Sequence, residues 1–328
     1  MDAFPKFSVI IPVKNEAGIL GRCLESLEKL DYDKGRLEVI LADGLSTDDT
    51  RQIAQRFNVR LVVNDKQVVV SGRNRGFAAA KGDIIVFTDA DCTFDPGWLK
   101  NSIKYFSDDK VGGVGGITLM PKESTDFEKA VELLFYLTDI FQATAHRGSV
   151  SLPREVKDIP GCNAMYRRSA LERVMPVDES LLTAEDVWMN FCIREAGYKL
   201  IAARDVTLWH YRRNSPKRFL RQIYRFAVGR LQVGKKNLSL LRPLHILFGI
   251  GIPIFFGSGI YFYLSANGIL FLKLNLFIFG LLAVLAIIKS RSLMVALNFL
   301  LVAILFFFYW SAGFLRELFF PLKDISGR

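Results

Sequence analysis

Two aspartates separated by one residue end an apolar run in the stretch from Ile84 to Cys92, IIVFTDADC. Side chains alternate between the two faces of a strand, so Asp89 and Asp91 can project to the same side. Carboxylate oxygens suit Mg²⁺ or Mn²⁺, which proteins usually hold together with waters and the phosphates of a substrate. The pair therefore predicts a metal-assisted site for a nucleotide diphosphate. The competing interpretation is an ordinary polar turn after a strand.

A second acidic pair, Glu185 and Asp186, precedes an apolar helical run that ends at Gly197. Thr183 lies three residues before Asp186, a spacing typical of a capping box, and acids in the first turn complement the helix dipole. These residues alone therefore predict a helix start around Thr183.

The elements that must position these carboxylates alternate between strand and helix. Apolar, β-branched runs predict strands at Phe7–Val13, Leu37–Ala42, Val59–Val63 and Ile84–Thr88. Helical patterns follow the first three, and Ser46 or Thr47 is expected to cap the second helix, which would run to about Phe57. The alternation predicts an α/β fold with a doubly wound parallel sheet that helices cover on both faces.

Polar residues follow three of these strands. They are Asn15 and Glu16, Asp43 to Ser46, and Asp89 to Asp91. In open α/β sheets, ligands bind beyond the carboxyl ends of the strands. A polar turn would explain any one of the clusters. Acidic groups at all three strand ends favour one shared binding site.

Other nucleotide-binding motifs are missing from this sequence. A dinucleotide-binding dehydrogenase needs several glycines in the first strand-to-helix turn, and Val13 to Gly18 contains one. Four later glycines lie within a strand-like segment, so we interpret them as close packing or as space beside a ligand: Gly112, Gly113, Gly115 and Gly116. The sequence also lacks a P-loop.

Hydrophobic residues are 51% of the 328 residues, and the mean hydropathy of +0.23 is high for a soluble enzyme. The four cysteines are far apart, which favours reduced thiols and argues against a structural metal site: Cys23, Cys92, Cys162 and Cys192. The N-terminal residues MDAFPKF are not a charged leader before an apolar run, so we expect the N-terminal half to stay in the cytoplasm.

Positive charge is concentrated after Tyr211. Ten basic residues lie between Arg212 and Arg242 without an acid, and the net charge of the whole chain is +10. Apolar residues are interleaved with them, so Pro216 to Val233 predicts a basic amphipathic helix at a membrane surface. Nucleic-acid binding is the competing explanation. The long apolar segment that follows argues against it.

Three apolar segments are each long enough to span a bilayer: 244–264, 269–288 and 293–315. The flanking basic residues, including Lys289 and Arg291, predict a multi-pass protein of the cell membrane with its enzyme half in the cytoplasm. The alternative is that one segment is re-entrant or interfacial. We expect a catalytic domain at 1–215, an interface helix at 216–243 and a membrane domain at 244–328. Phe127 to Ala145 predicts a further amphipathic helix, facing either the membrane or a core.

Several of these segments together resemble family 2 inverting glycosyltransferases of the GT-A fold. The resemblance covers roughly residues 5 to 230 and rests on PVKNE from Pro12, ADGLSTDDT from Ala42, GRNRG from Gly72, TDADC from Thr88, PGCNAMYRRSAL from Pro160, TAEDVW from Thr183 and QIYRF from Gln222. Leu45 and Phe226 depart from the residues that are common in the family.

The resemblance implies roles for individual residues. Asp43 would accept a hydrogen bond from the nucleobase, and Asp186 would deprotonate the acceptor hydroxyl beside Glu185. Asp91 would bind the metal directly, with Asp89 on its water shell and His210 completing the coordination. The implied donor-binding residues are Pro12, Val13, Asn15, Glu16, Asp43, Gly44, Ser46, Arg73, Asp89, Ala90, Gln222 and Arg225.

We therefore expect a glycosyltransferase that uses Mg²⁺ or Mn²⁺ and a nucleotide sugar, UDP-linked rather than GDP-linked, and that does not bind nucleic acid. The predicted acceptor is a hydroxyl of a lipid-linked saccharide, since a hydroxyl needs a base and an ionised phosphate does not. The alternatives are a polyprenyl-phosphate hexose synthase and a non-catalytic nucleotide-binding membrane scaffold.

Overall fold

The computed structural model describes residues 4–138, 153–211, 215–265 and 267–321. These residues fall into two compact units. The first contains residues 4–121 and 153–211, and the second contains residues 122–138, 215–265 and 267–321.

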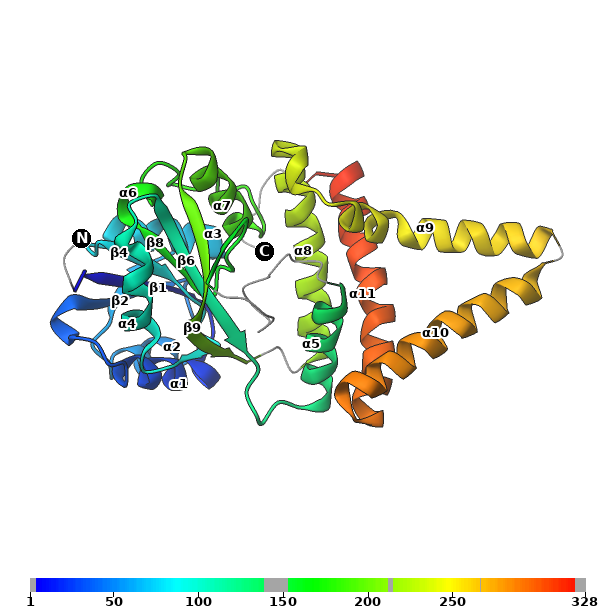
Figure 1. Ribbon diagram of the computed structural model, residues 1–328, viewed down its shortest axis with the longest axis horizontal. Coiled ribbons are helices and arrows are strands. Elements are labelled where there is room, and N and C mark those ends of the chain that lie inside the picture. Colours follow the sequence, from blue (N-terminus) through cyan, green and yellow to red (C-terminus); the bar gives the residue numbers. More distant parts are fainter. Residues whose placement is uncertain (1–3, 139–152, 212–214, 266, 322–328) are drawn as a thin grey trace. The chain divides into compact units, whose positions relative to one another are not determined.

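The first unit is a sheet with helices between its strands (Figure 1). In chain order, with η for a 3₁₀ helix, its elements are β1 (Phe7–Val13), α1 (Ala17–Glu28), η1 (Lys34–Arg36), β2 (Leu37–Asp43), α2 (Thr50–Ala54), β3 (Arg60–Val63), α3 (Val69–Ala79), β4 (Ile84–Phe87), β5 (Cys92–Phe94), α4 (Trp98–Ser102), η2 (Ile103–Ser107), β6 (Val111–Leu119), β7 (Arg154–Val156), β8 (Ala164–Arg167), α6 (Arg168–Leu171), α7 (Glu185–Glu195) and β9 (Lys199–His210).

The described strands form one nine-stranded sheet of order β3-β2-β1-β4-β8-β6-β9-β5, with β7 paired to β9. The predicted α/β fold is confirmed, and β1 to β4 are parallel as expected. Beyond β4 the sheet is mixed, because β8 runs antiparallel to both β4 and β6. The chain enters β8 from the carboxyl edge of β4, where the hydroxyl of Thr88 donates to the carbonyl of Cys162 at 2.8 Å. Strand–helix alternation cannot predict such a reversal.

Helices cover both faces of the parallel part of the sheet. The apolar stripe of α1, which includes Leu20 and Leu24, packs in one core with Val9 and Ile11 of β1. On the opposite face, α3 packs against Ile10. Figure 1 shows α1 and α2 on one side of the sheet and α6 and α7 on the other. The carboxyl edge of the sheet remains available for the loops that follow β1, β2 and β4.

The glycines of β6 serve close packing, one of the two interpretations expected from sequence. The register between β6 and β9 shifts after Gly116, where β9 bulges around Val206. A Cβ atom on Gly116 would lie 1.6 Å from the backbone oxygen of Val206, so no larger residue fits there.

The second unit is helical. Its elements are α5 (Asp126–Thr138), α8 (Pro216–Lys236), η3 (Leu238–Leu240), α9 (Pro243–Leu264), α10 (Gly268–Ser290) and α11 (Leu293–Phe319). Among the described residues, α9, α10 and α11 are long and apolar enough to cross a membrane. These helices coincide with the three apolar segments predicted as spans.

The core of the second unit joins α5, α8 and α11. Val131 and Phe135 of α5 pack with Phe219 of α8 and Phe306 of α11. This packing favours the core-facing alternative for the helix predicted at 127–145, of which residues 139–145 lie outside the described residues. At the far ends of α8 and α11, Lys235 Nζ pairs with the buried Glu317 carboxylate at 2.8 Å.

Candidate active site

The loops after β1 and β2 are hydrogen-bonded to each other. The backbone N–H of Asn15 donates to the hydroxyl of Ser46 at 3.0 Å, and the Asn15 side-chain oxygen accepts from the N–H of Thr47 at 2.8 Å. Asn15 has a left-handed backbone (φ 56°), a conformation that asparagine tolerates better than most residues. Glu16 follows directly and donates its N–H to the Thr50 hydroxyl at 2.8 Å. Two of the predicted donor-binding loops are therefore one structural unit.

Asp43 is the last residue of β2 and lies beside Val13, the last residue of β1. Its side chain is buried and accepts from the Ser46 N–H at 3.1 Å and from Arg51 Nε at 2.5 Å. The N–H of Gly44 donates to the Val13 carbonyl at 2.8 Å, which joins the carboxyl ends of β1 and β2. Sequence reasoning did not find Arg51 as a partner of this carboxylate. The nucleobase contact of Asp43 remains a prediction.

The start of α2 differs from the expectation. Ser46 and Thr47 do not cap it, because α2 begins at Thr50 with Asp49 at its N-cap and ends at Ala54. Ser46 and Thr47 instead bond to Asn15, as described above. The Asp48 carboxylate accepts from the N–H of Ala17 at 3.1 Å, so this loop serves the first turn of α1.

The predicted capping box at the second acidic pair is wrong. Helix α7 begins at Glu185, and its N-cap is Ala184, which has a left-handed backbone (φ 64°) and no capping side-chain hydrogen bond. Glu185 is only 6% exposed and turns toward α3, where its Oε1 lies 2.7 Å from Nη1 of Arg73. Asp186 Oδ2 accepts the backbone N–H of Gly161 at 3.0 Å. The Glu185 side chain therefore serves the contact with α3, whereas Asp186 bonds both to Gly161 and, through Oδ1, to the N–H of Val187 in the first turn of α7 at 2.9 Å.

Arg73 connects the two acidic motifs. Its Nη2 lies 3.6 Å from Oδ1 of Asp89, while Nη1 pairs with Glu185. Burial lowers the pKa of the Arg73 guanidinium, but Glu185 and Asp89 outweigh it and hold that pKa above its ordinary value. Burial raises the pKa of Glu185 and of Asp89, and Arg73 opposes both shifts. The carboxylates from the turn after β4 and from the start of α7 thus share one charged site.

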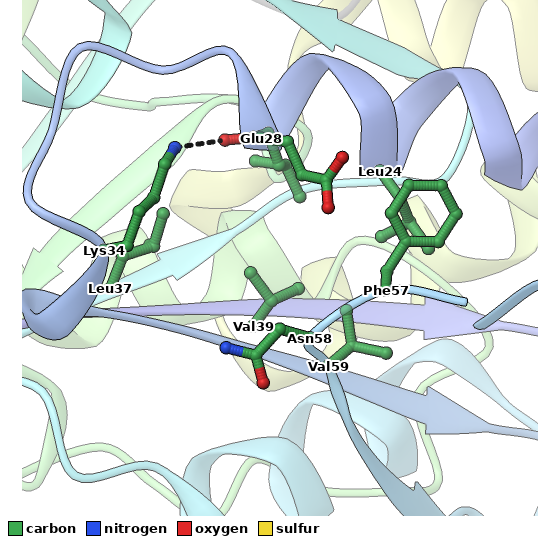
Figure 2. Close-up of a pocket in the computed structure, with 9 residues that line it drawn as sticks. Leu24, Glu28, Lys34, Leu37, Val39, Phe57, Asn58 and Val59 are labelled. Carbon is green, nitrogen blue, oxygen red and sulfur yellow. Dashed lines mark hydrogen bonds between the residues drawn. The ribbon is translucent and has the colours of Figure 1, made fainter. Parts of the chain in front are cut away.

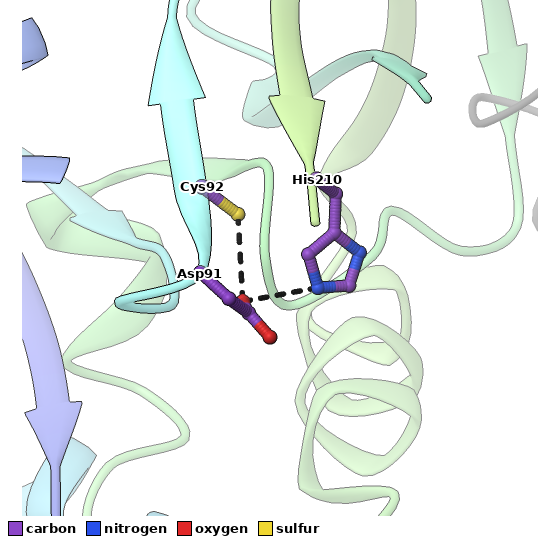
Figure 3. A group of neighbouring side chains, drawn as sticks. All are labelled: Asp91, Cys92 and His210. Carbon is purple, nitrogen blue, oxygen red and sulfur yellow. Dashed lines mark hydrogen bonds and ion pairs between the residues drawn. The ribbon is translucent and has the colours of Figure 1, made fainter. Parts of the chain in front are cut away.

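Asp91 and His210 form the candidate metal site. Figure 3 shows the imidazole of His210 pointing at the Asp91 carboxylate, with Nε2 and Oδ1 3.0 Å apart. Strand pairing explains this contact, because His210 ends β9 opposite Cys92, the residue after Asp91. Both side chains are partly open, at 18% and 13% exposure. A partly exposed carboxylate and imidazole fit Mn²⁺ or Mg²⁺, whose coordination waters and phosphate oxygens usually complete. The part predicted for Asp89 in this site remains a prediction.

Cys92 completes the only cluster of at least three potential ligands found among the described residues, with its Sγ atom 3.9 Å from Asp91 Oδ1. Burial and the neighbouring Cys162 raise the pKa of the Cys92 thiol well above its usual range. A protonated thiol is a poor ligand for Mg²⁺ or Mn²⁺. All four cysteines are described and none forms a disulfide, which agrees with the expectation from their spacing.

Not every predicted residue belongs to this arrangement. Pro12, Val13, Arg73, Ala90 and the loop residues all lie in the first unit. Gln222 and Arg225 lie on α8 of the second unit, so their role beside the donor remains a prediction. Gly161 had no predicted role, although its motif, PGCNA, was singled out in the sequence.

Figure 2 shows a separate pocket, of about 260 Å³. It is lined by residues of α1, the first part of β2 and the connection into β3, including Leu27, Leu37, Phe57 and Val59. The pocket contains none of the predicted site residues. The chemistry inferred from the sequence is thus at the carboxyl edge of the sheet, and this pocket is at the amino edge.

The site and the fold define a class of α/β enzymes with carboxylates at the carboxyl edge of the sheet. The family model described as glycosyl transferase family 2 matches residues 8–175, and the chain belongs to this family. The chain is 30% identical over 251 residues to glycosyltransferase AglE of Haloferax volcanii, covering 74% of this chain and 79% of that protein. It is 26% identical over 278 residues to the dolichyl N-acetyl-alpha-D-glucosaminyl phosphate 3-beta-D-2,3-diacetamido-2,3-dideoxy-beta-D-glucuronosyltransferase of Methanococcus voltae, covering 79% and 84%.

Two solved structures extend the comparison to the fold. The mannosyltransferase of Pyrobaculum calidifontis, in complex with GDP-Man and Mn²⁺, superposes with a TM-score of 0.61 over 96% of this chain and 87% of that one, at 20% identity. Staphylococcus aureus TarS 1-349, in complex with UDP, gives a TM-score of 0.50 over 69% and 65%, at 21% identity. The first unit therefore has the GT-A fold, as the sequence resemblance implied.

Proposed function

We propose that this protein is a membrane-bound, inverting glycosyltransferase. It transfers a sugar from a nucleotide-diphosphate donor to a hydroxyl of a lipid-linked saccharide. The observation that carries the proposal is the Arg73 guanidinium, which contacts Asp89 at 3.6 Å and Glu185 at 2.7 Å. The shared contact of Asp89, on the expected donor side, and Glu185, beside the expected base, supports a single site for both.

In this proposal, Asp186 accepts the proton of the acceptor hydroxyl as the hydroxyl oxygen attacks the anomeric carbon. Attack from the face opposite the leaving nucleoside diphosphate inverts the anomeric centre in a single displacement. A divalent cation held by Asp91, Asp89 and His210 would neutralise charge on the departing diphosphate. Asp43 and the two loops that are joined by the Asn15–Ser46 hydrogen bond hold the nucleoside at the ends of β1 and β2.

The second unit supports a membrane location. Only 11% of the apolar stretch of α9 and 6% of that of α10 are buried within the described structure. The large side chains of both helices are therefore available to lipid tails. Lys217, Arg218 and Arg221 on α8 are exposed and suit anionic headgroups. We propose that these helices anchor the protein in the cell membrane with the catalytic unit in the cytoplasm.

The acceptor class is supported by a relative. The Methanococcus voltae enzyme is named for transfer to a dolichyl-linked sugar phosphate. A base at Asp186 agrees with this acceptor because a sugar hydroxyl must lose a proton, whereas a polyprenyl phosphate is already ionised. The two similar solved structures contain GDP-Man and UDP, so the preference for a UDP-linked donor is part of the proposal.

The test is an acceptor-discrimination assay with the full chain in phospholipid nanodiscs. UDP- and GDP-linked sugars are supplied with Mn²⁺ or Mg²⁺ and with either a polyprenyl-linked saccharide or polyprenyl phosphate. We expect sugar transfer to the saccharide with inverted anomeric configuration, and a loss of about 10²–10⁴-fold in kcat for Asp186→Asn. Transfer only to polyprenyl phosphate would make the protein a hexose synthase. Nucleotide binding with no transfer to either acceptor would support the scaffold alternative.

A further inference from the structure

Arg73 is almost completely enclosed by protein. The residue is 4% exposed, its Nη1 pairs with Glu185, and its Nη2 donates to the carbonyl oxygen of Gly161 at 3.1 Å. The guanidinium carbon also lies 5.4 Å from the centre of the Phe87 ring. These contacts of the cation are with the protein itself, while its Nε and Nη1 have no hydrogen-bond acceptor among the described residues.

Gly161 connects Arg73 to Asp186 by two hydrogen bonds. Its carbonyl accepts from Arg73, and its N–H donates to Asp186 Oδ2 at 3.0 Å. A Cβ atom at position 161 would lie 2.6 Å from Nη1 and 2.7 Å from Nη2 of Arg73. Only glycine lets the planar guanidinium lie against this backbone. Arg73 and Asp186 are thus linked through the two polar groups of one residue.

The segment that contains Gly161 is fixed at other points as well. The Thr88 hydroxyl donates to the carbonyl of Cys162 at 2.8 Å, next to the acidic turn after β4. The side-chain amide of Asn190, on α7, donates to the carbonyl of Ile159 at 2.8 Å. Thr88 and Asn190 are fully buried, so these hydrogen bonds are shielded from water. The backbone of 159–163 is a rigid bridge between the acidic turn and the helix that starts at Glu185.

We propose that Arg73 is a positioning residue that acts on the base through Gly161, instead of a ligand of the donor diphosphate. It holds Glu185 and the Gly161 carbonyl, so that the Gly161 N–H fixes the Asp186 carboxylate relative to Asp89. This differs from the donor-binding role that the family resemblance implies for Arg73. The inference rests on the proposed function, in which Asp186 is the base.

Arginine suits this role for a geometric reason. Its planar guanidinium can contact Glu185, Asp89 and the Gly161 carbonyl at the same time, whereas a lysine ammonium is a point charge on a flexible stem. A displacement of a catalytic group by about 1 Å can lower a rate by about 10²-fold. Arg73→Lys keeps the positive charge but loses the planar arrangement of hydrogen-bond donors, so its effect should be mainly on kcat.

The test compares Arg73→Lys and Gly161→Ala with the parent and with Arg75→Lys, an exposed arginine on the same helix that pairs with Asp65. We expect kcat to fall by about 10²-fold in both site variants, with donor KM and the calorimetric Kd for the nucleoside diphosphate and Mn²⁺ changed by less than about threefold, or 0.7 kcal/mol. The double variant should be no slower than the slower single variant, because both changes break one linkage. A rise of tenfold or more in the nucleotide Kd at unchanged kcat would overturn the proposal and make Arg73 a donor ligand.

A second measurement does not depend on turnover. Hydrogen exchange of the 159–163 segment should be faster in Arg73→Lys than in the parent and unchanged in Arg75→Lys, since the Gly161 carbonyl loses the Arg73 donor that holds this segment in place. Equal exchange in parent and Arg73→Lys would contradict the proposal even if the parent transfers no sugar. Parent inactivity by itself would count against the proposed function alone. If Arg73→Lys does not fold, Gly161→Ala decides, because that variant leaves every charge in place.

Discussion

Nε2 of His210 lies 3.0 Å from Oδ1 of Asp91, so the end of β9 and the turn after β4 meet at one point. Strand pairing brings them together, because Cys92 of β5 is the register partner of His210 in the antiparallel pair with β9. Two residues far apart in the sequence can therefore offer a nitrogen and an oxygen to the same cation.

The first prediction concerns His210. Replacing it with alanine should weaken Mn²⁺ binding by about tenfold or more, because the site loses one ligand and keeps its carboxylates. His210→Gln should lose less affinity, since the amide oxygen can still coordinate. Calorimetric titration of Mn²⁺ in the presence of nucleoside diphosphate measures both. Equal affinity in the parent and the alanine variant would remove His210 from the metal site.

The second prediction concerns packing between β6 and β9. Gly116→Ala should destabilise the first unit by about 3 kcal/mol or more, because its Cβ would overlap the Val206 carbonyl. Gly18→Ala is the matched control: this residue lies in α1 with nothing within 4 Å of an added Cβ. Alanine favours a helix over glycine by about 1 kcal/mol, so this variant should be neutral or more stable. Denaturant unfolding that ranks the two variants in the opposite order would contradict the packing described for β6.

The third prediction is a pH dependence at the bulge of β9. Asp205 accepts from Lys104 Nζ at 2.6 Å and from the Tyr105 hydroxyl at 2.7 Å. Partial burial raises the pKa of Asp205, but these two hydrogen bonds outweigh it and hold the pKa below its ordinary value of 3.8. A carboxylate with a lowered pKa stabilises the fold above its unfolded pKa, and that stabilisation is lost as pH falls through the folded pKa.

Asp205→Asn should therefore lower the melting temperature by about 2 °C near neutral pH. The difference from the parent should shrink as the pH falls below about 3.8, where the parent carboxylate also becomes neutral. Asp109→Asn, whose side chain is 94% exposed, is the control and should change little at any pH. A difference for Asp205→Asn that stays constant down to low pH would show that its charge is not the source of the stabilisation.

Much of the fold could be predicted because its signals are local. Apolar runs identified β1, β2 and β4, and an unbroken apolar composition placed α9 at Pro243–Leu264 against a predicted 244–264. The reversed direction of β8 could not be predicted, since it depends on where the segment before it is held in space. The starts of α2 and α7 were also missed, because their N-caps are Asp49 and Ala184. Ser46 and Thr47, expected to cap α2, are instead hydrogen-bonded to Asn15.

The site shows the same division. Sequence motifs placed Asp43, Asp89 and Asp91 at the carboxyl edge, because strand ends follow from local pattern. The contact between Arg73 and Glu185 joins α3 to α7, and no spacing rule connects two helices so far apart in the chain. The contact of Gly161 with Arg73 is likewise a product of tertiary packing.

The central claim is that carboxylates from separate motifs hold a divalent cation for sugar transfer. It is tested most directly by measuring initial transfer rates of the parent, Asp91→Asn and Asp109→Asn while Mn²⁺ is titrated from a chelated starting point. We predict that the parent and Asp109→Asn are inactive in chelator and recover fully with Mn²⁺, while Asp91→Asn stays at least about 10²-fold slower at every Mn²⁺ concentration. Transfer by Asp91→Asn at the parent rate, or parent transfer that persists unchanged in chelator, would contradict the account.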